Sequence, residues 1–146
     1  MERRRSNLKA WSVVTVCAVL GLALGAAVSA RPPGQPTRLA VVWSSADPEV
    51  AHRVCLMYTH ASRKSSWFDE THLIIWGPSA RLLAADKDIQ AKVKEMMADG
   101  VVVRACQACA DSYGVTEALR AQGIEVKYMG KPLSDILHEG WKVLTF

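Results

Sequence analysis

Short apolar runs alternate with helical patterns from Arg38 to Phe146, and this alternation constrains the fold more than any other feature of the chain. The apolar runs are RLAVVW, THLIIWGP, VVVRA, IEVKYM and WKVLTF. Each is short enough for a buried strand. Unbroken strand–helix alternation is typical of βαβ units, whose helices cover both faces of a parallel sheet. The sequence therefore predicts an α/β fold, a three-layer sandwich with a mainly parallel five-stranded sheet.

The turn and capping signals predict where these elements begin and end. Gly-Pro stops the second run, and Pro48 is suited to the first turn of a helix. The strands are expected at residues 38–43, 71–78, 101–105, 124–129 and 141–146. The helices are expected at about 48–62, 87–100, 112–123 and 131–140.

Residues 1–30 have the pattern of an export signal. A basic cluster precedes a stretch from Trp11 to Ala30 that contains no charged residue. The stretch ends in the small residues AAVSA, which fit cleavage after Ala30. Because 20 uncharged residues are also about long enough to span a bilayer, an uncleaved membrane anchor over residues 11–30 is the alternative. In both cases the basic flank favours an exported, periplasmic domain, and we favour cleavage.

The rest of the chain is a proline-rich spacer, residues 31–37, followed by a domain over residues 38–146. Four of the 18 basic residues and one of the 14 acidic residues lie within residues 1–30, which leaves 14 basic against 13 acidic. The domain is thus nearly neutral and has no basic patch typical of nucleic-acid binding. The segment after the first strand, WSSADPE, lacks a phosphate-binding glycine pattern, which argues against a nucleotide enzyme. The thiol chemistry expected below requires no cofactor.

Cys106 and Cys109 are the candidate site. Cys106 follows the expected third strand by one residue and precedes a helical segment. Ligands of parallel sheets gather at this end of the strands. Free backbone N–H groups and the helix dipole there favour a thiolate. Strand alternation places Arg104 on the opposite side from Ala105, so we do not count it as a partner of Cys106.

Three interpretations of this pair stay open from the residues alone. Both cysteines can be small buried residues at a strand–helix junction. They can form a redox pair, since the Cys-x-x-Cys spacing fits and an oxidising compartment favours a disulfide. A zinc or iron–sulfur site is disfavoured, because only Cys55 and four scattered histidines could complete about four ligands. Three cysteines in an exported domain leave at least one free thiol or an intermolecular bond.

Other residues have simpler expectations. His60 lies near a helix end, where a partly charged imidazole complements the helix dipole. His72 opens a strand and His138 lies in the last helix, and both are interpreted as surface or capping residues. Cys55 shares an apolar helical stripe and is interpreted as buried. Trp43 and Trp76 lie at the carboxyl ends of their strands, where they can wall a pocket near Cys106 or pack against another subunit.

Residues 41–146 resemble the DsrE-like family of small α/β proteins, which are related to sulfur-relay proteins such as TusD. The stretches that carry the resemblance are LIIWGPSARLL, DGVVVRACQACADSYGV and GIEVKYMGKPLSDILHEGWKVLTF. The resemblance implies the family fold, a trimer or hexamer, and a persulfide carried by the cysteine after the third strand. By position that cysteine is Cys106. Cys109 stands where sulfur-relay members have a small residue, so it is either a resolving thiol or a packing residue.

We therefore expect an exported DsrE-like protein that handles sulfur or thiol chemistry through Cys106 and Cys109, as a persulfide carrier or sulfurtransferase. Its expected partners are other copies of the chain and a sulfur donor or acceptor protein. No nucleic acid is expected, and membrane contact is expected only through an uncleaved N-terminus. The alternative is a non-catalytic oligomeric module that binds a small molecule or a protein partner, with structural cysteines.

Overall fold

The structure is a computed structural model that describes residue 34 and residues 36–146. The predicted export signal or anchor, residues 1–30, lies outside the described residues, as does most of the spacer. Within the described part of the chain, no helix has the length and apolar content needed to cross a bilayer.

Five strands form one sheet in which every neighbouring pair is parallel. Their order across the sheet is β4-β3-β2-β1-β5. Burial from the second residue onward in both β1 and β2 matches the apolar run LAVVW of β1 and the apolar second half, LII, of β2. The strands are β1 (Arg38–Trp43), β2 (Glu70–Ile75), β3 (Val102–Cys106), β4 (Glu125–Lys127) and β5 (Lys142–Thr145).

Two helices, α2 and α5, begin after residues whose side chains accept hydrogen bonds from otherwise unpaired backbone amides. Asp47 accepts from the amide of Glu49 at 2.8 Å, and Asp86 accepts from the amides of Asp88 and Ile89 at 2.9 and 3.0 Å. The helical segments are α2 (Pro48–Val50), the π-helical turn η1 (Ala51–Cys55), α3 (Leu56–Lys64), α4 (Ser79–Ala85), α5 (Lys87–Ala98), α6 (Gln107–Ser112), α7 (Thr116–Arg120) and α8 (Gly130–His138).

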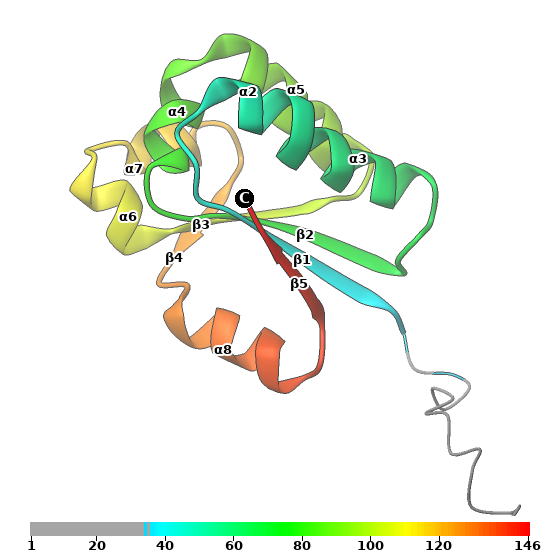
Figure 1. The fold of residues 1–146 in the computed structure, drawn as a ribbon. Helices are drawn as coiled ribbons and strands as arrows, with labels where there is room; N and C mark the ends of the chain where they lie inside the picture. Colours follow the sequence, from blue (N-terminus) through cyan, green and yellow to red (C-terminus); the bar gives the residue numbers. More distant parts are fainter. Residues whose placement is uncertain (1–33, 35) are drawn as a thin grey trace, which may run out of the picture. The chain divides into compact units, whose positions relative to one another are not determined.

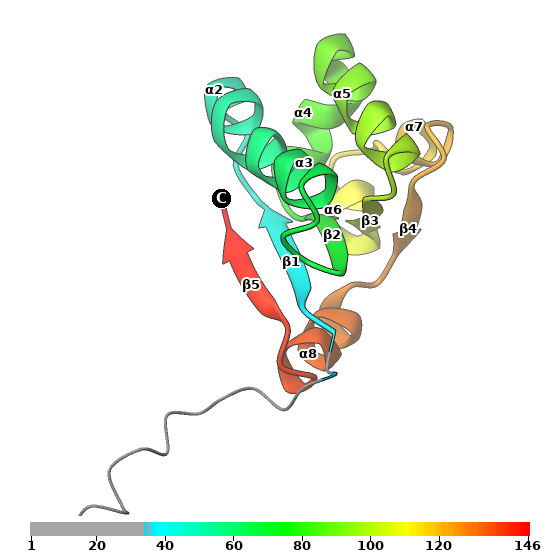
Figure 2. The same ribbon diagram turned by 90° about the vertical axis from the view of Figure 1, so that its right-hand side faces the viewer.

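The order of the strands explains the layers. Strands β1 to β4 follow one another in a single direction across the sheet, and right-handed crossovers place all their connecting helices on one face. The connection from β4 to β5 runs back across the sheet, so α8 lies on the opposite face (Figure 1). Figure 2 shows the same division, with α8 apart from α2 to α5. The predicted three-layer α/β sandwich is confirmed, and its sheet is entirely parallel.

Each face of the sheet has its own apolar core. The larger core, under α2 to α7, includes Trp43, Leu73, Leu83 and Met96, all fully buried. The smaller core lies under α8 and contains Ala40, Val42, Ile74, Cys106, Met129 and Ile136. Because α8 is the one helix on that face, Val102 and Val143 there are only partly buried.

Several predicted boundaries shift. The third strand ends at Cys106 itself, and α6 begins at the next residue, five residues before the helix expected from the sequence. Gly114, with φ of 66°, then separates α6 from α7. β4 is shorter than expected, because its Lys127 pairs with Cys106 and β3 offers no strand partner beyond that residue.

Candidate functional site

Cys106 and Cys109 lie together at the carboxyl end of β3. Cys106 is the last residue of the strand and occupies the N-cap position of α6, with extended φ and ψ of −71° and 117°. Cys109 lies in the first turn of that helix, and side chains three positions apart share one side of a helix. Cys106 contributes to raising the pKa of Cys109, so the two thiols lie close enough to interact. The structure therefore brings the two predicted site residues together.

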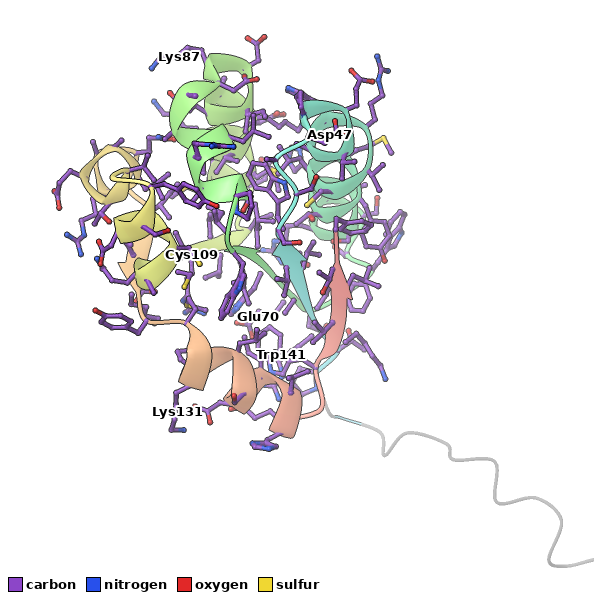
Figure 3. The ribbon with its side chains drawn as sticks, turned by 60° about the vertical axis from the view of Figure 1, so that its left-hand side comes forward. Asp47, Glu70, Lys87, Cys109, Lys131 and Trp141 are labelled. Atoms are coloured by element: carbon purple, nitrogen blue, oxygen red, sulfur yellow. The ribbon has the colours of Figure 1, made fainter. Side chains whose placement is uncertain are left out.

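The two thiols differ in burial. Cys106 is 5% exposed and belongs to the smaller core, with Ile74 of β2 and Ile136 of α8. Cys109 is half-buried and packs against the edge of that core. Figure 3 shows Cys109 on the side of α6 that faces α8. A reagent arriving from solvent therefore meets Cys109 before it reaches Cys106.

The surroundings of Cys109 keep its thiol protonated. Burial raises the pKa of Cys109, and the hydrogen bond and the negative charge of Cys106 raise it further. A hydrogen bond from the backbone of Gly77, in the loop after β2, lowers the pKa in partial compensation. Gly77 has φ of 67°, a left-handed conformation that favours glycine, so its backbone can turn towards Cys109.

The start of α6 does not bind the Cys106 thiol. The first amides of a helix have no acceptor within the helix, but Cys106 makes no side-chain hydrogen bond to them. α6 is also only six residues long.

Two cationic side chains of the sheet project from the same face as Cys106. Arg104 is two residues earlier on β3, and Lys127 is the register partner of Cys106 on β4. Glu125 joins them, accepting from Arg104 Nε at 2.8 Å and from Lys127 Nζ at 2.7 Å. Arg104 does lie opposite Ala105, as expected, but that places it beside Cys106, because residues two apart on a strand share a face. The bonds of Arg104 run to Glu125 and His72, and its exclusion as a partner of Cys106 stays a prediction.

His72, expected as a surface or capping residue, and His60, expected at a helix end, are both buried, with 4% exposure each. His72 lies on β2 under α8; its Nε2 pairs with Glu70, and its Nδ1 accepts from Arg104 at 3.1 Å. His60 lies between α3 and α5, with Nε2 2.7 Å from Asp99 and Nδ1 2.7 Å from Lys92. Their ring nitrogens form hydrogen bonds with neighbouring charged groups. Such bonds offset the free-energy cost of removing a buried polar group from water.

The tryptophans near the rim divide between the two faces. Trp76 is partly buried and packs against the core that contains Cys106. Trp43 is fully buried in the larger core, on the other face, so it does not wall a pocket over the thiols. Cys55 is also fully buried there, as expected, and burial raises its pKa to about 12.

One group of side chains has metal-ligand spacing. The ligand atoms of His60, Glu95 and Asp99 lie within 4.8 Å of one another. Lys92 already supplies a cation there, with Nζ 2.7 Å from His60 Nδ1 and 2.9 Å from Glu95. Among the described residues, no cluster of three or more metal-ligating side chains includes Cys106 or Cys109. The zinc or iron–sulfur interpretation of the pair therefore lacks ligands.

Two residues near the cysteines, Gly77 and Lys127, were not predicted from the sequence as part of the site. The sequence pattern predicts for Gly77 only that it ends a strand. Its interaction with Cys109 depends on how β2 and β3 pair. The sequence pattern places Lys127 on a strand but does not show which residue it lies beside. Its position beside Cys106 depends on the β3–β4 register. The strand order could have placed these two residues near the cysteines, because the loops after neighbouring parallel strands meet at one edge of the sheet.

Comparisons with known proteins agree with the fold. The model of the DsrE/DsrF-like family matches residues 40–146. A conserved protein of unknown function from Bacteroides thetaiotaomicron, BT1422, is 32% identical, with a TM-score of 0.72 over 75% of this chain and 94% of that chain. The YchN protein of E. coli is 20% identical and shares the fold, with a TM-score of 0.62 over 77% of this chain and 100% of that chain. No curated protein matches the sequence.

The family match covers most of the chain and includes both cysteines of the candidate site. The resemblance predicted from the sequence is therefore confirmed. The chain belongs to the DsrE/DsrF-like family, which is associated with sulfur relay in general.

Proposed function

We propose that this protein handles sulfur through the cysteine pair, with Cys106 as the persulfide carrier and Cys109 as the resolving thiol. The observation that carries the proposal is the pair of neighbouring thiols at the carboxyl end of β3, where the pKa of Cys109 responds to Cys106. One thiol lies at the edge of the buried core and one within it, an arrangement that suits exchange between them.

Loading is a thiolate exchange. The Cys106 thiolate attacks the outer sulfur of a persulfide donor, and a new S–S bond forms on Cys106. The S–S bond of the donor breaks, and the donor leaves as a thiolate with the electron pair. Cys109, whose pKa is raised, stays protonated during this step and does not compete for the incoming sulfur.

Unloading has two routes. A thiolate acceptor can attack the outer sulfur and take it away, which restores the Cys106 thiolate. Alternatively, the sulfur of Cys109 attacks Sγ of Cys106, and a disulfide forms. Hydrosulfide then leaves with the electron pair and the proton of Cys109. A dithiol reductant must reduce that disulfide before the next cycle.

We also propose that the protein is exported and homo-oligomeric. The basic cluster and uncharged stretch of residues 1–30 support export, with cleavage or with retention as an anchor. Large apolar side chains exposed on the described domain support subunit contacts. These exposed side chains are Val54, Met57, Trp67, Tyr113, Tyr128, Leu137 and Leu144.

One observation favours the second candidate function, a non-catalytic binding module. Cys106 is 5% exposed within an apolar core, and free cysteine is often a packing residue. In that case both thiols would be structural, and the family fold would serve to bind a small molecule or a protein.

The experiment that separates the two functions is intact-mass analysis after incubation with glutathione persulfide. The proposal expects the wild-type protein and Cys109→Ser to gain the mass of one sulfur atom, located on Cys106 by peptide mapping. Cys106→Ser should gain none. Cys109→Ser should also hold its sulfur longer than the wild type, because the resolving step is absent. A protein that is folded but gains no sulfur on Cys106 would contradict the carrier role and favour the binding module.

A further inference from the structure

We infer that a second copy of this chain binds along strand β5, so that the two β5 strands pair antiparallel across a twofold axis. The inference rests on the proposed homo-oligomer, since it names the surface through which two copies meet. It is carried by three observations: the open backbone of β5, the apolar side chains beside it, and two unpaired charges at its opposite ends.

Strand β5 is an open edge of the sheet. Among the described strands it pairs with β1 alone, because it stands last in the strand order. The amide of Phe146 donates to Val42 at 3.0 Å and its carbonyl accepts from Ser44 at 2.7 Å, so both groups face β1. Alternation along the strand then turns the N–H and C=O groups of Val143 and Thr145 outward. These four backbone groups have no strand partner within the described residues and can pair with another strand.

The two edges of the sheet differ in their protection against pairing. The opposite edge, β4, is three residues long and carries the charged residues Glu125 and Lys127. Short, charged edge strands resist pairing with another chain. β5 is longer, contains no proline and carries a single charge, Lys142 at its start. Its central residue, Leu144, is apolar and 38% exposed.

The exposed side of α3 lies along the same edge. Leu144 is the register partner of Val41, which belongs to the larger core, so Leu144 leaves the sheet on the face that α3 covers. On α3, His60 bonds to residues of α5, and Tyr58, two positions earlier, lies on the opposite side of the helix. That side faces β5, because α3 lies between β5 and α5 (Figure 2).

Apolar residues on this side enlarge the surface that a second copy can cover. Tyr58 contacts the ring of Trp67, which is 55% exposed, and Val54, one turn before Tyr58, is 41% exposed. Two paired four-residue strands alone bury less than the roughly 1,200 Å² of a small stable interface, so this additional area is needed. A twofold axis normal to the sheet keeps α3 of both copies on one face, where these side chains meet above the paired strands.

One register of self-pairing uses all four outward backbone groups. In this register Leu144 stands opposite Leu144 of the second copy, and Val143 of each copy exchanges hydrogen bonds with Thr145 of the other. Lys142 stands opposite Phe146 of the second copy. Like charges directly opposite would destabilise the pair, and this register contains none.

Two unpaired charges are complementary in this arrangement. Asp47 accepts from backbone amides of α2, and neither Asp47 nor Lys142 forms an ion pair within the part of the chain that the structure describes. Asp47 follows the Ser44–Ser45 segment, whose amides bind the carbonyl of Phe146, so it lies at the carboxyl end of β5. Antiparallel pairing brings Lys142 of one copy to the end where Asp47 of the other copy lies.

Sedimentation equilibrium of the full chain tests the contact. The wild type should form a dimer or a larger oligomer with an even number of copies. Leu144→Lys should halve the mass of this oligomer, because it sets two ammonium groups opposite each other and removes the leucine contact. Thr145→Pro should do the same, because it removes an outward N–H without breaking a bond to β1. Leu137→Lys adds the same charge at an exposed site on α8 and should leave the mass unchanged.

Disulfide cross-linking tests the register. The background is the full chain in which serine replaces every cysteine except the fully buried Cys55. Adding Leu144→Cys should give a cross-linked dimer on mild oxidation with diamide, because residues directly opposite each other lie within disulfide reach. Lys142→Cys in the same background should give none, because the two copies of that position lie roughly 14 Å apart, four strand residues.

The outcomes distinguish the inference from the proposed homo-oligomer. A halved mass in Leu144→Lys and a cross-link through Leu144→Cys support both. An unchanged mass in Leu144→Lys, or a wild-type trimer, which has no twofold axis, overturns the β5 contact while the homo-oligomer stands. A monomeric wild type overturns both and leaves the β5 edge to an extended segment of another protein. Thermal unfolding checks the fold of each variant, and if Leu144→Lys fails to fold, Thr145→Pro and the cross-link decide.

Discussion

The imidazole of His72 lies against the indole of Trp141, with ring centroids 4.5 Å apart and planes inclined by 58°. Trp141 follows α8 and is itself covered by the guanidinium of Arg38 at 4.8 Å. His72, on β2, is thereby buried under the segment that follows α8. One ring nitrogen is hydrogen-bonded to Glu70 and the other to Arg104. A histidine in this position cannot gain a proton without loss of a favourable contact.

This arrangement predicts that stability falls when the solution becomes mildly acidic. Burial lowers the pKa of His72 below its ordinary value of 6.5, although Glu70 acts in the opposite direction. The unfolded chain therefore binds this proton more readily than the folded protein. The contribution of His72 is complete above pH 6.5 and is lost as the pH falls from 6.5 through the folded pKa.

Urea denaturation of the wild type and of His72→Gln measures the effect. Between about pH 7.5 and about pH 5.5, the free energy of unfolding should fall in the wild type and fall less in the variant. Staying above about pH 5 keeps most carboxylates charged in both states. His138→Gln, at an exposed site in the last turn of α8, is the matched control and should keep the wild-type slope. An identical slope in His72→Gln would contradict the prediction.

The strand–helix alternation was sufficient to predict the sheet, because its central strands contain the buried apolar residues that a doubly covered parallel sheet requires. The same reasoning could not predict the burial of His72. A histidine at the start of a strand has the same local pattern whether it faces water or an aromatic ring from a segment 69 positions away. Its burial follows from α8 crossing to the far face, and only the strand order determines that crossing.

The candidate site was predictable in part for a related reason. The spacing of Cys106 and Cys109, together with a strand before them, is enough to place both thiols at one rim. Their neighbours come from other strands: Gly77 from the loop after β2 and Lys127 from β4. Register between strands is set by long-range packing, and one sequence read along its length does not contain it.

The coupling between the two thiols predicts that removing Cys106 makes Cys109 more reactive. Burial raises the pKa of Cys109 in both proteins, but Cys106→Ala removes the hydrogen bond and the charge that raise it further. Alkylation of Cys109 by iodoacetamide at about pH 8 should become roughly two- to tenfold faster. Peptide mapping by mass spectrometry gives the rate for this residue alone.

A second substitution tests the cause. Cys106→Ser keeps a hydroxyl that can hydrogen-bond but cannot ionise, so its effect on Cys109 should be intermediate. If both variants alkylate at the wild-type rate, the charge and hydrogen bond of Cys106 do not control Cys109.

Cys55 should be inert in the folded protein. Its side chain is fully buried and burial raises its pKa to about 12, so the thiolate is scarce at neutral pH. We expect a maleimide reagent to leave Cys55 unmodified in buffer and to modify it only across the urea unfolding transition. Cys55→Ala should lower the free energy of unfolding by about 1 kcal/mol through the small cavity it leaves. Modification of Cys55 in buffer, without unfolding, would contradict the burial of this residue.

The left-handed backbone of Gly77 connects the stability of the β2–α4 loop to the reactivity of Cys109. Gly77 has φ of 67°, and a Cβ at this position would meet no atom within 4 Å, so Gly77→Ala introduces backbone strain without a steric clash. We expect the free energy of unfolding to fall by about 1 kcal/mol. If the strained loop relaxes, the hydrogen bond from Gly77 is lost, the pKa of Cys109 rises, and its alkylation slows. Gly130→Ala offers the same substitution in open space without a left-handed φ, and it should cause neither change. A Gly77→Ala protein with wild-type stability and wild-type alkylation of Cys109 would show that this loop neither carries strain nor supports the thiol.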